Sequence, residues 1–146
     1  MRGIEKLHPK VRKKAELLKQ LCKEKNLNVL ITETWRSKDE QDALYAKGRT
    51  APGSIVTNCV FPQSAHCWGV AFDFCRNVKG SEFTNEDGFF NTVGQVGKSI
   101  GLFWGGDFKS FSDMPHFEDP EFMTNNSTNV LIKKWGTPEN FKENWF

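Results

Sequence analysis

Residues 70–75 form a short apolar run with a carboxylate near its centre. The sequence there is Val-Ala-Phe-Asp-Phe-Cys, and its alternation with a period of two predicts a β-strand. Burying the charge of Asp73 in such a strand is unfavourable unless the carboxylate is paired or bound to a cation. Its neighbours on the same face, Ala71 and Cys75, are small and leave space beside it. The strand therefore indicates a cation site.

Two of the three histidines of the chain can join Asp73 in a metal site. His66 precedes the aspartate on the same segment, and Gly69 between them permits a sharp turn. His116 lies on a second alternating segment. Catalytic zinc takes three ligands of these types and leaves a fourth position for water. Spacing alone favours the alternative that both histidines are hydrogen-bonded structural residues. The charge of Asp73 inside an apolar strand makes a zinc site an equal alternative.

A general base is needed beside such a metal. Bound zinc lowers the pKa of its water to roughly 7, and a nearby side chain then has to accept the proton of that water. Asp113 lies shortly before His116, across a turn that Pro115 constrains. This spacing favours Asp113 as the base.

Helices and short strands are expected in mixed order along the rest of the chain. Helices are expected from Pro9, after the capping box of Ser37 and Glu40, over residues 89–100, and from Thr137. Strands are expected over residues 28–34, 70–75, 102–104 and 115–118. Because the elements do not alternate regularly, we expect an α+β fold. Its small antiparallel sheet would carry the zinc site and be flanked by three or more helices.

Particular residues predict the stability of one of these helices and the buried face of another. Gly94 and Gly97 weaken the helix over residues 89–100 in propensity terms. The helix from Pro9 is expected to bury a stripe that Leu17 and Leu21 widen; the stripe consists of Val11, Ala15, Leu18 and Cys22.

The length of 146 residues is that of one compact domain. We expect a catalytic domain over residues 1–120 and an extension over residues 121–146 that packs on it or trails it. That extension is too short for a separate wall-binding domain. We also expect a monomer.

Charge and hydropathy narrow the possible partners. The net charge of +2 is too small to favour nucleic acid, and no apolar run is long enough for membrane insertion. Residues 1–25 nevertheless hold nine Lys and Arg against three Glu. Both a solvated helix face and attraction to an anionic wall polymer remain open for this segment. The four cysteines form no CxxC pair and are expected to be reduced thiols.

Residues 64–73 read Ser-x-His-x-x-Gly-x-Ala-x-Asp. This pattern resembles the signature of the zinc D-Ala-D-Ala peptidase superfamily, in which a carboxylate-x-x-His pair follows downstream, as Asp113 and His116 do here. Further segments resemble the L-alanyl-D-glutamate endopeptidases of phage endolysins and their bacterial relatives; these are residues 35–37 with 40–41, 44–50, 104–107 and 115–118. The resemblance covers residues 4–120 in the right order.

The resemblance implies roles for individual residues. His66, Asp73 and His116 would hold Zn²⁺, and Asp113 would be the general base. Arg36 would bind a substrate carboxylate or stabilise the developing oxyanion, a role that suits a guanidinium. An ion pair of Arg36 with Glu33 or Asp39 remains an alternative.

Three more residues would contact substrate by the same resemblance: Ser64, Gln41 and Trp104. A turn role for Ser64 and a core position for Trp104 remain alternatives. The chain departs from the family pattern at Cys67, where asparagine is usual. A thiolate there could compete as a ligand. Strand-like alternation beside His66 predicts that the Cys67 side chain points elsewhere.

The function that the resemblance implies is zinc-dependent hydrolysis of bacterial peptidoglycan at the L-Ala–D-Glu bond of the stem peptide. The alternatives are a D-Ala-D-Ala carboxypeptidase or dipeptidase and a non-catalytic wall-binding module. The N-terminus shows no charged-then-apolar signal pattern. A phage endolysin of this kind would wait in the host cytoplasm until a holin releases it to the wall.

Overall fold

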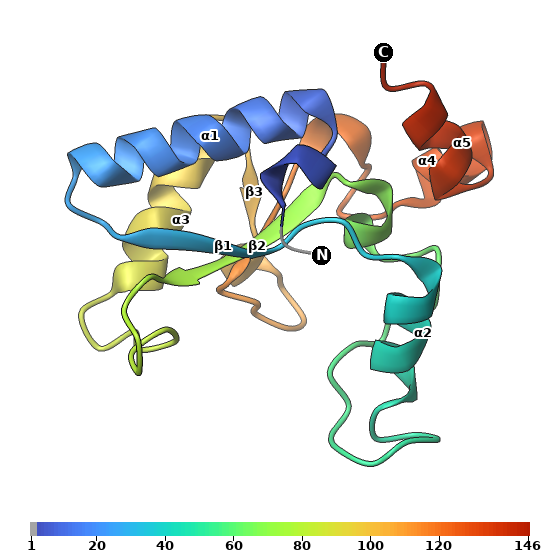
Figure 1. Ribbon diagram of the computed structural model, residues 1–146, viewed down its shortest axis with the longest axis horizontal. Helices are drawn as coiled ribbons and strands as arrows, with labels where there is room; N and C mark the ends of the chain where they lie inside the picture. Colours follow the sequence, from blue (N-terminus) through green and yellow to red (C-terminus); the bar gives the residue numbers. More distant parts are fainter. Residues whose placement is uncertain (1–2) are drawn as a thin grey trace.

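A four-stranded antiparallel sheet forms the centre of the molecule in the computed structural model, which describes residues 3–146. The strands are β1 (Val29–Glu33), β2 (Ala71–Arg76), β3 (Phe103–Trp104) and β4 (His116–Glu118), and their order in the sheet is β1-β2-β4-β3. All of the neighbouring strands run antiparallel. The predicted α+β class is confirmed (Figure 1).

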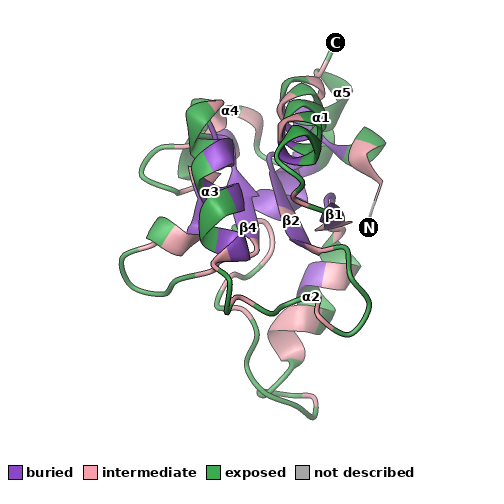
Figure 2. Ribbon diagram, turned by 90° about the vertical axis from the view of Figure 1, so that its left-hand side faces the viewer, coloured by how far each residue is buried: buried purple, intermediate pink, exposed green. Residues whose placement is uncertain are grey.

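Five α-helices accompany the sheet in the described part of the chain. They are α1 (Pro9–Glu24), α2 (Lys38–Ala46), α3 (Phe89–Ser99), α4 (Asn129–Trp135) and α5 (Pro138–Glu143). α1 and α3 pack against each other and cover one face of the sheet (Figures 1 and 2). The buried residues gather on β2 and β4 and on the helix sides that face them (Figure 2). None of the described helices is both long and apolar enough to cross a membrane.

The two faces of β2 have different surroundings because successive side chains of a strand point to opposite sides. The Phe74 ring lies on the helix-covered face, 5.4 Å from the Phe90 ring of α3 and 5.0 Å from the Phe117 ring of β4. Asp73 therefore points to the opposite face. The sheet thus separates a hydrophobic core from the polar cluster described below.

The helix starts follow the predicted capping chemistry. Ser37 and Glu40 form a complete capping box, in which the Glu40 amide donates to the Ser37 hydroxyl and the Ser37 amide to the Glu40 carboxylate. The apolar stripe of α1 is buried as predicted. Leu17, however, is 42% exposed, so the stripe is narrower on that side than we expected. Successive residues of an α-helix are rotated by about 100° around its axis, so Leu17 points away from the side on which its neighbour Leu18 is buried.

Gly94 and Gly97 do more than weaken α3. A methyl group on Gly94 would overlap the Trp104 ring, and one on Gly97 would overlap the Phe117 ring. Both rings lie on the strands beneath the helix. The glycines thus let the backbone of α3 approach β3 and β4 closely.

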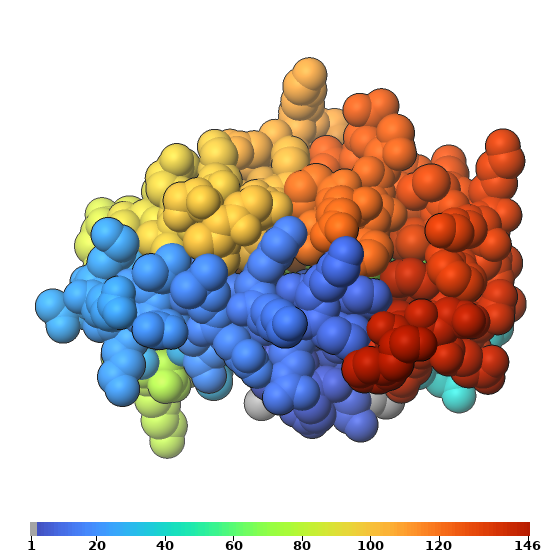
Figure 3. Space-filling view, turned by 90° about the horizontal axis from the view of Figure 1, so that it is seen from above, coloured from blue at the N-terminus to red at the C-terminus, as the bar shows by residue number. Residues whose placement is uncertain are grey.

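The C-terminal segment packs on the rest of the molecule. Phe141 of α5 is buried, and its ring centroid lies 5.5 Å from that of His8 and 5.8 Å from that of Trp68. The C-terminal residues lie beside the N-terminal end of α1 (Figure 3). The sequence predicted α5 but not α4, because α4 follows a polar, asparagine-rich stretch.

Candidate metal centre and catalytic cleft

Strand pairing brings Asp73 and His116 together. Asp73 of β2 and His116 of β4 are direct partners in the antiparallel register, so their side chains lie next to each other on one face. His66 comes from a short 3-10 helix, Ala65–Trp68, which ends at Gly69. Gly69 has a φ of 69°, and this left-handed turn leads the chain directly into β2.

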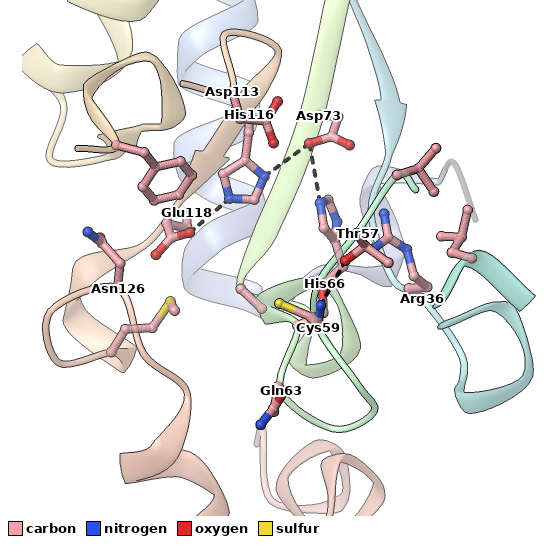
Figure 4. Close-up of a pocket in the computed structure, with 16 residues that line it drawn as sticks. Arg36, Thr57, Cys59, Gln63, His66, Asp73, Asp113, His116, Glu118 and Asn126 are labelled. Atoms are coloured by element: carbon pink, nitrogen blue, oxygen red, sulfur yellow. Dashed lines mark hydrogen bonds and ion pairs between the residues drawn. The ribbon is translucent and has the colours of Figure 1, made fainter. Parts of the chain in front are cut away.

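The three side chains converge on one carboxylate oxygen. Asp73 Oδ1 lies 3.2 Å from His66 Nε2 and 3.1 Å from His116 Nδ1 (Figure 4). One ligand atom from each of the three residues fits within 4.8 Å of the others. Both histidines are almost fully buried.

The outer nitrogen of each histidine faces an acceptor. His66 Nδ1 lies 3.0 Å from the backbone oxygen of Thr34, and His116 Nε2 lies 2.8 Å from Glu118 Oε1. Neutral rings that donate at these nitrogens direct their lone pairs toward Asp73. Two lone pairs and a carboxylate then face one another, which is the donor set of a catalytic zinc with outer hydrogen bonds that fix the tautomers. The residues present therefore fit Zn²⁺.

The pKa values of Asp73 and His116 show that the carboxylates of the cluster stabilise positive charge beside them. Burial acts to lower the pKa of His116, but hydrogen bonds to Asp73 and Glu118 outweigh it and raise the pKa to about 10. Burial acts to raise the pKa of Asp73, but the two histidines hold it well below its usual range. The carboxylates thus retain a proton on His116 when no metal is bound, and metal binding releases such protons.

Asp113 lines the same cleft as the three candidate ligands. Its position is fixed by the backbone: the Asp113 amide donates to the Gly105 oxygen at 2.8 Å, and the His116 amide to the Asp113 oxygen at 3.2 Å. A side chain at Gly105 would collide with the Asp113 carbonyl, which explains the glycine turn. Burial, with a contribution from the charge of Asp73, raises the pKa of Asp113 and makes the carboxylate a better proton acceptor.

Comparison with known proteins agrees with this geometry. Residues 61–119, which include all three candidate ligands and Asp113, match a peptidase M15 profile described as D-alanyl-D-alanine carboxypeptidase. The chain is 40% identical over 121 residues to the peptidoglycan L-alanyl-D-glutamate endopeptidase CwlK of Bacillus subtilis (strain 168), covering 77% of this chain and 72% of CwlK. The chain belongs to peptidase family M15. The family resemblance predicted from the motifs is confirmed.

Two solved structures share the fold of the chain. The L-Ala D-Glu endopeptidase ChiX of Serratia marcescens superposes with a TM-score of 0.60 at 18% identity, over 79% of this chain and 81% of ChiX. The LD-carboxypeptidase LdcB superposes with a TM-score of 0.61 at 12% identity, over 94% of this chain and 68% of LdcB. At these identities the similarity is one of fold.

In this M15 peptidase, the described residues that line the cleft include a single arginine, Arg36, and no lysine. One guanidinium nitrogen donates to Gln41 Oε1 at 3.0 Å, and its backbone amide donates to the His66 oxygen at 3.1 Å. Its Nε is buried and makes no hydrogen bond. The side chain is thus held in place with donor capacity left for an anionic group.

The residues expected to contact substrate divide into two groups. Ser64 lines the cleft. Gln41 and Trp104 do not, and both are buried. Gln41 donates to the Cys59 oxygen at 2.7 Å while it accepts from Arg36, and Trp104 donates to the Met114 oxygen at 2.8 Å. The structure thus places Gln41 and Trp104 outside the cleft lining, and substrate contact by these two residues stays a prediction.

Cys67 does not join the metal cluster. It is fully buried, its Sγ lies 3.8 Å from Gln41 Oε1, and burial raises the pKa of the thiol to about 12. A protonated thiol that donates to Gln41 and lies outside the cluster of candidate ligands does not compete for zinc. The expectation that its side chain points elsewhere is confirmed.

Glu118 lies in the motif segment of residues 115–118, and the sequence left open whether it supports the metal site from outside or faces solvent. The structure shows the first arrangement, because Glu118 is buried, accepts from His116 and has a second oxygen that is buried without a hydrogen bond. Other residues of the cleft were not singled out by the sequence. No motif marked the rest of the lining, which includes Val56, Thr57, Cys59, Phe108, Met123 and Asn126.

Proposed function

We propose that this M15 peptidase is a zinc-dependent endopeptidase that hydrolyses the L-Ala–D-Glu bond in the stem peptide of bacterial peptidoglycan. The observation that carries the proposal is the identity of 40% with CwlK, a peptidoglycan L-alanyl-D-glutamate endopeptidase, over most of both chains. The cluster of His66, Asp73 and His116 supports the metal dependence.

The positions of the side chains in the cleft support the roles that we propose for them. His66, Asp73 and His116 would hold the metal. Zinc bound there would polarise the scissile carbonyl and acidify a water molecule. A carboxylate oxygen of Asp113 accepts the proton of that water and later delivers it to the leaving amine. Arg36 donates to a substrate carboxylate or to the oxyanion that forms at the scissile carbonyl.

Mass spectrometry of a digest of purified peptidoglycan tests the scissile bond. The expected products carry new L-Ala C-termini and new D-Glu N-termini. A digest with EDTA is the matched control, because removal of the metal is expected to abolish these products. Lysis that EDTA leaves unchanged would overturn the metal dependence.

A D-Ala-D-Ala carboxypeptidase is the second candidate. The description of the profile that residues 61–119 match favours it. The same digest separates the two activities, because a carboxypeptidase releases free D-Ala and leaves the L-Ala–D-Glu bond intact.

A role as a phage endolysin belongs to the same proposal, and the motif resemblance supports it. We propose that the protein acts as a monomer on peptidoglycan after release from the host cytoplasm. Expression in bacteria with and without a holin tests the route, since lysis is expected only with the holin. Sedimentation of the purified protein tests the oligomeric state.

A further inference from the structure

We propose that a side hollow next to the catalytic cleft binds the sugar ring that precedes L-Ala in peptidoglycan. The side hollow is lined mainly by Ile55, Val56, Asn58, Phe108, Phe111 and Asp113 and has a volume of about 350 Å³. The proposal rests on the proposed L-Ala–D-Glu endopeptidase activity and adds the glycan to its substrate.

The side hollow continues the catalytic cleft. Val56, Thr57, Cys59, Phe108 and Asp113 line both. The Phe108 ring also lies 5.6 Å from the imidazole of His116. Any group in the side hollow is therefore within a short distance of the base and of the metal cluster, as the next unit of a substrate has to be.

The apolar lining of the side hollow is unusually open to solvent. Phe111 is 76% exposed, and Val56 and Ile55 are 59% and 57% exposed. They come from two loops that meet at the side hollow, one before the 3-10 helix of His66 and one before β4. Exposed apolar side chains that gather at a concave site mark a binding surface.

The charges around the side hollow indicate which side of the scissile bond it binds. Among the described residues that line it, Asp113 is the one carboxylate, and Lys, Arg and His are absent. Arg36 lines the cleft but not the side hollow. The stem peptide after the scissile bond carries the D-Glu carboxylate and a charged diamino acid, which match Arg36 better.

The unit on the other side of the scissile bond is uncharged where it meets the peptide. L-Ala is linked through a lactyl ether to N-acetylmuramic acid, a sugar with an apolar ring face, hydroxyls and an acetamide. Aromatic rings such as Phe111 offer a flat apolar surface to such a ring, while Asn58 and Ser110 offer hydrogen-bonding groups. The lining therefore fits the sugar rather than the distal peptide.

Two substrates that differ only in this sugar test the proposal. One is N-acetylmuramyl-L-Ala-D-Glu-L-Lys, and the other is the same peptide with an acetyl group in place of the muramyl group. We expect the wild-type protein to have a kcat/KM about tenfold higher for the muramyl substrate, mainly through KM. Phe111→Ala is expected to abolish this preference.

Phe146→Ala is the matched control, because Phe146 is fully exposed outside the side hollow. It is expected to keep the preference. Equal kcat/KM values of the wild type for the two substrates, or an undiminished preference in Phe111→Ala, would overturn the sugar site while cleavage of both peptides upholds the endopeptidase. Failure of the wild type to cut either substrate at L-Ala–D-Glu would instead overturn the endopeptidase and the sugar site with it.

Discussion

Asp113 sits in the catalytic cleft without being one of the clustered ligands, so its function can be separated from metal binding. We expect Asp113→Asn to lower kcat by about 10²–10⁴-fold, the usual contribution of general acid–base catalysis. Zinc content and the unfolding midpoint are expected to stay at wild-type values. Turnover by Asp113→Asn at the wild-type rate would exclude Asp113 as the base.

Glu118 orients His116 from outside the metal cluster. Its carboxylate accepts at 2.8 Å from His116 Nε2, which leaves Nδ1 directed at Asp73. Loss of such an outer partner typically weakens metal affinity by about 10–100-fold. We expect Glu118→Gln to show this loss in competition with a chromogenic chelator.

Glu86→Gln is the control for that measurement, because Glu86 is exposed on a loop away from the cleft. It makes the same chemical change and is expected to keep wild-type zinc affinity. Equal affinities of Glu118→Gln and Glu86→Gln would show that Glu118 does not orient the ligand.

At the scale of single elements, a Gly→Ala substitution in α3 has two opposing effects on stability, a gain in helix propensity and a loss through overpacking. The sign of the measured change shows which effect is larger. Alanine in place of a helix-interior glycine stabilises an isolated helix by about 1 kcal/mol. At Gly97 the new methyl group would overlap the Phe117 ring. We expect Gly97→Ala to lower the free energy of unfolding by about 1–3 kcal/mol, as overpacking does.

Urea unfolding measures this difference, with Gln95→Ala as the control on the exposed side of the same helix. Gln95→Ala is expected to change stability by less than about 0.5 kcal/mol. A Gly97→Ala protein more stable than the wild type would mean that α3 can shift away from β4 without loss.

Elements with strong local signals were predicted well, and contacts between distant segments were not. The stripe of α1, the Ser37 capping box and the alternation of β2 are properties of short windows. The pairing of Asp73 with His116 depends on which strands become neighbours, and it was mainly the family motifs that indicated it. The burial of Gln41 and Trp104 and the two loops of the cleft depend on tertiary packing in the same way.

At the scale of the whole molecule, the C-terminal segment is joined to the core through Phe141. Its ring packs among aromatic rings from several segments, including His8, Trp68, Phe122, Trp135 and Trp145. We expect Phe141→Ala to destabilise the protein by about 3–5 kcal/mol in urea unfolding. Phe146→Ala, at the exposed end of the same segment, is expected to cost less than about 0.5 kcal/mol.

Metal binding is expected to stabilise the fold as a whole, since the three candidate ligands lie on a 3-10 helix, on β2 and on β4. A metal present at about 100 times its Kd adds roughly 2.7 kcal/mol, which for a chain of this size raises Tm by roughly 5–10 °C. Differential scanning calorimetry with and without zinc measures the shift. His116→Ala is expected to remove it, and an equal shift in His116→Ala would place the metal elsewhere.

The hydrogen bond of His66 to Thr34 connects the metal cluster to the segment that follows β1. His66 bonds the Thr34 carbonyl just beyond β1, while Asp73 and His116 belong to β2 and β4. The cluster thus connects three adjacent strands, and we expect a metal bound there to make them separate less readily. Without a metal, the amide hydrogens of these strands would exchange with solvent through local opening at a lower free energy than that of global unfolding. The same side chains that form the candidate metal site would then also determine how often the strands of the sheet open locally.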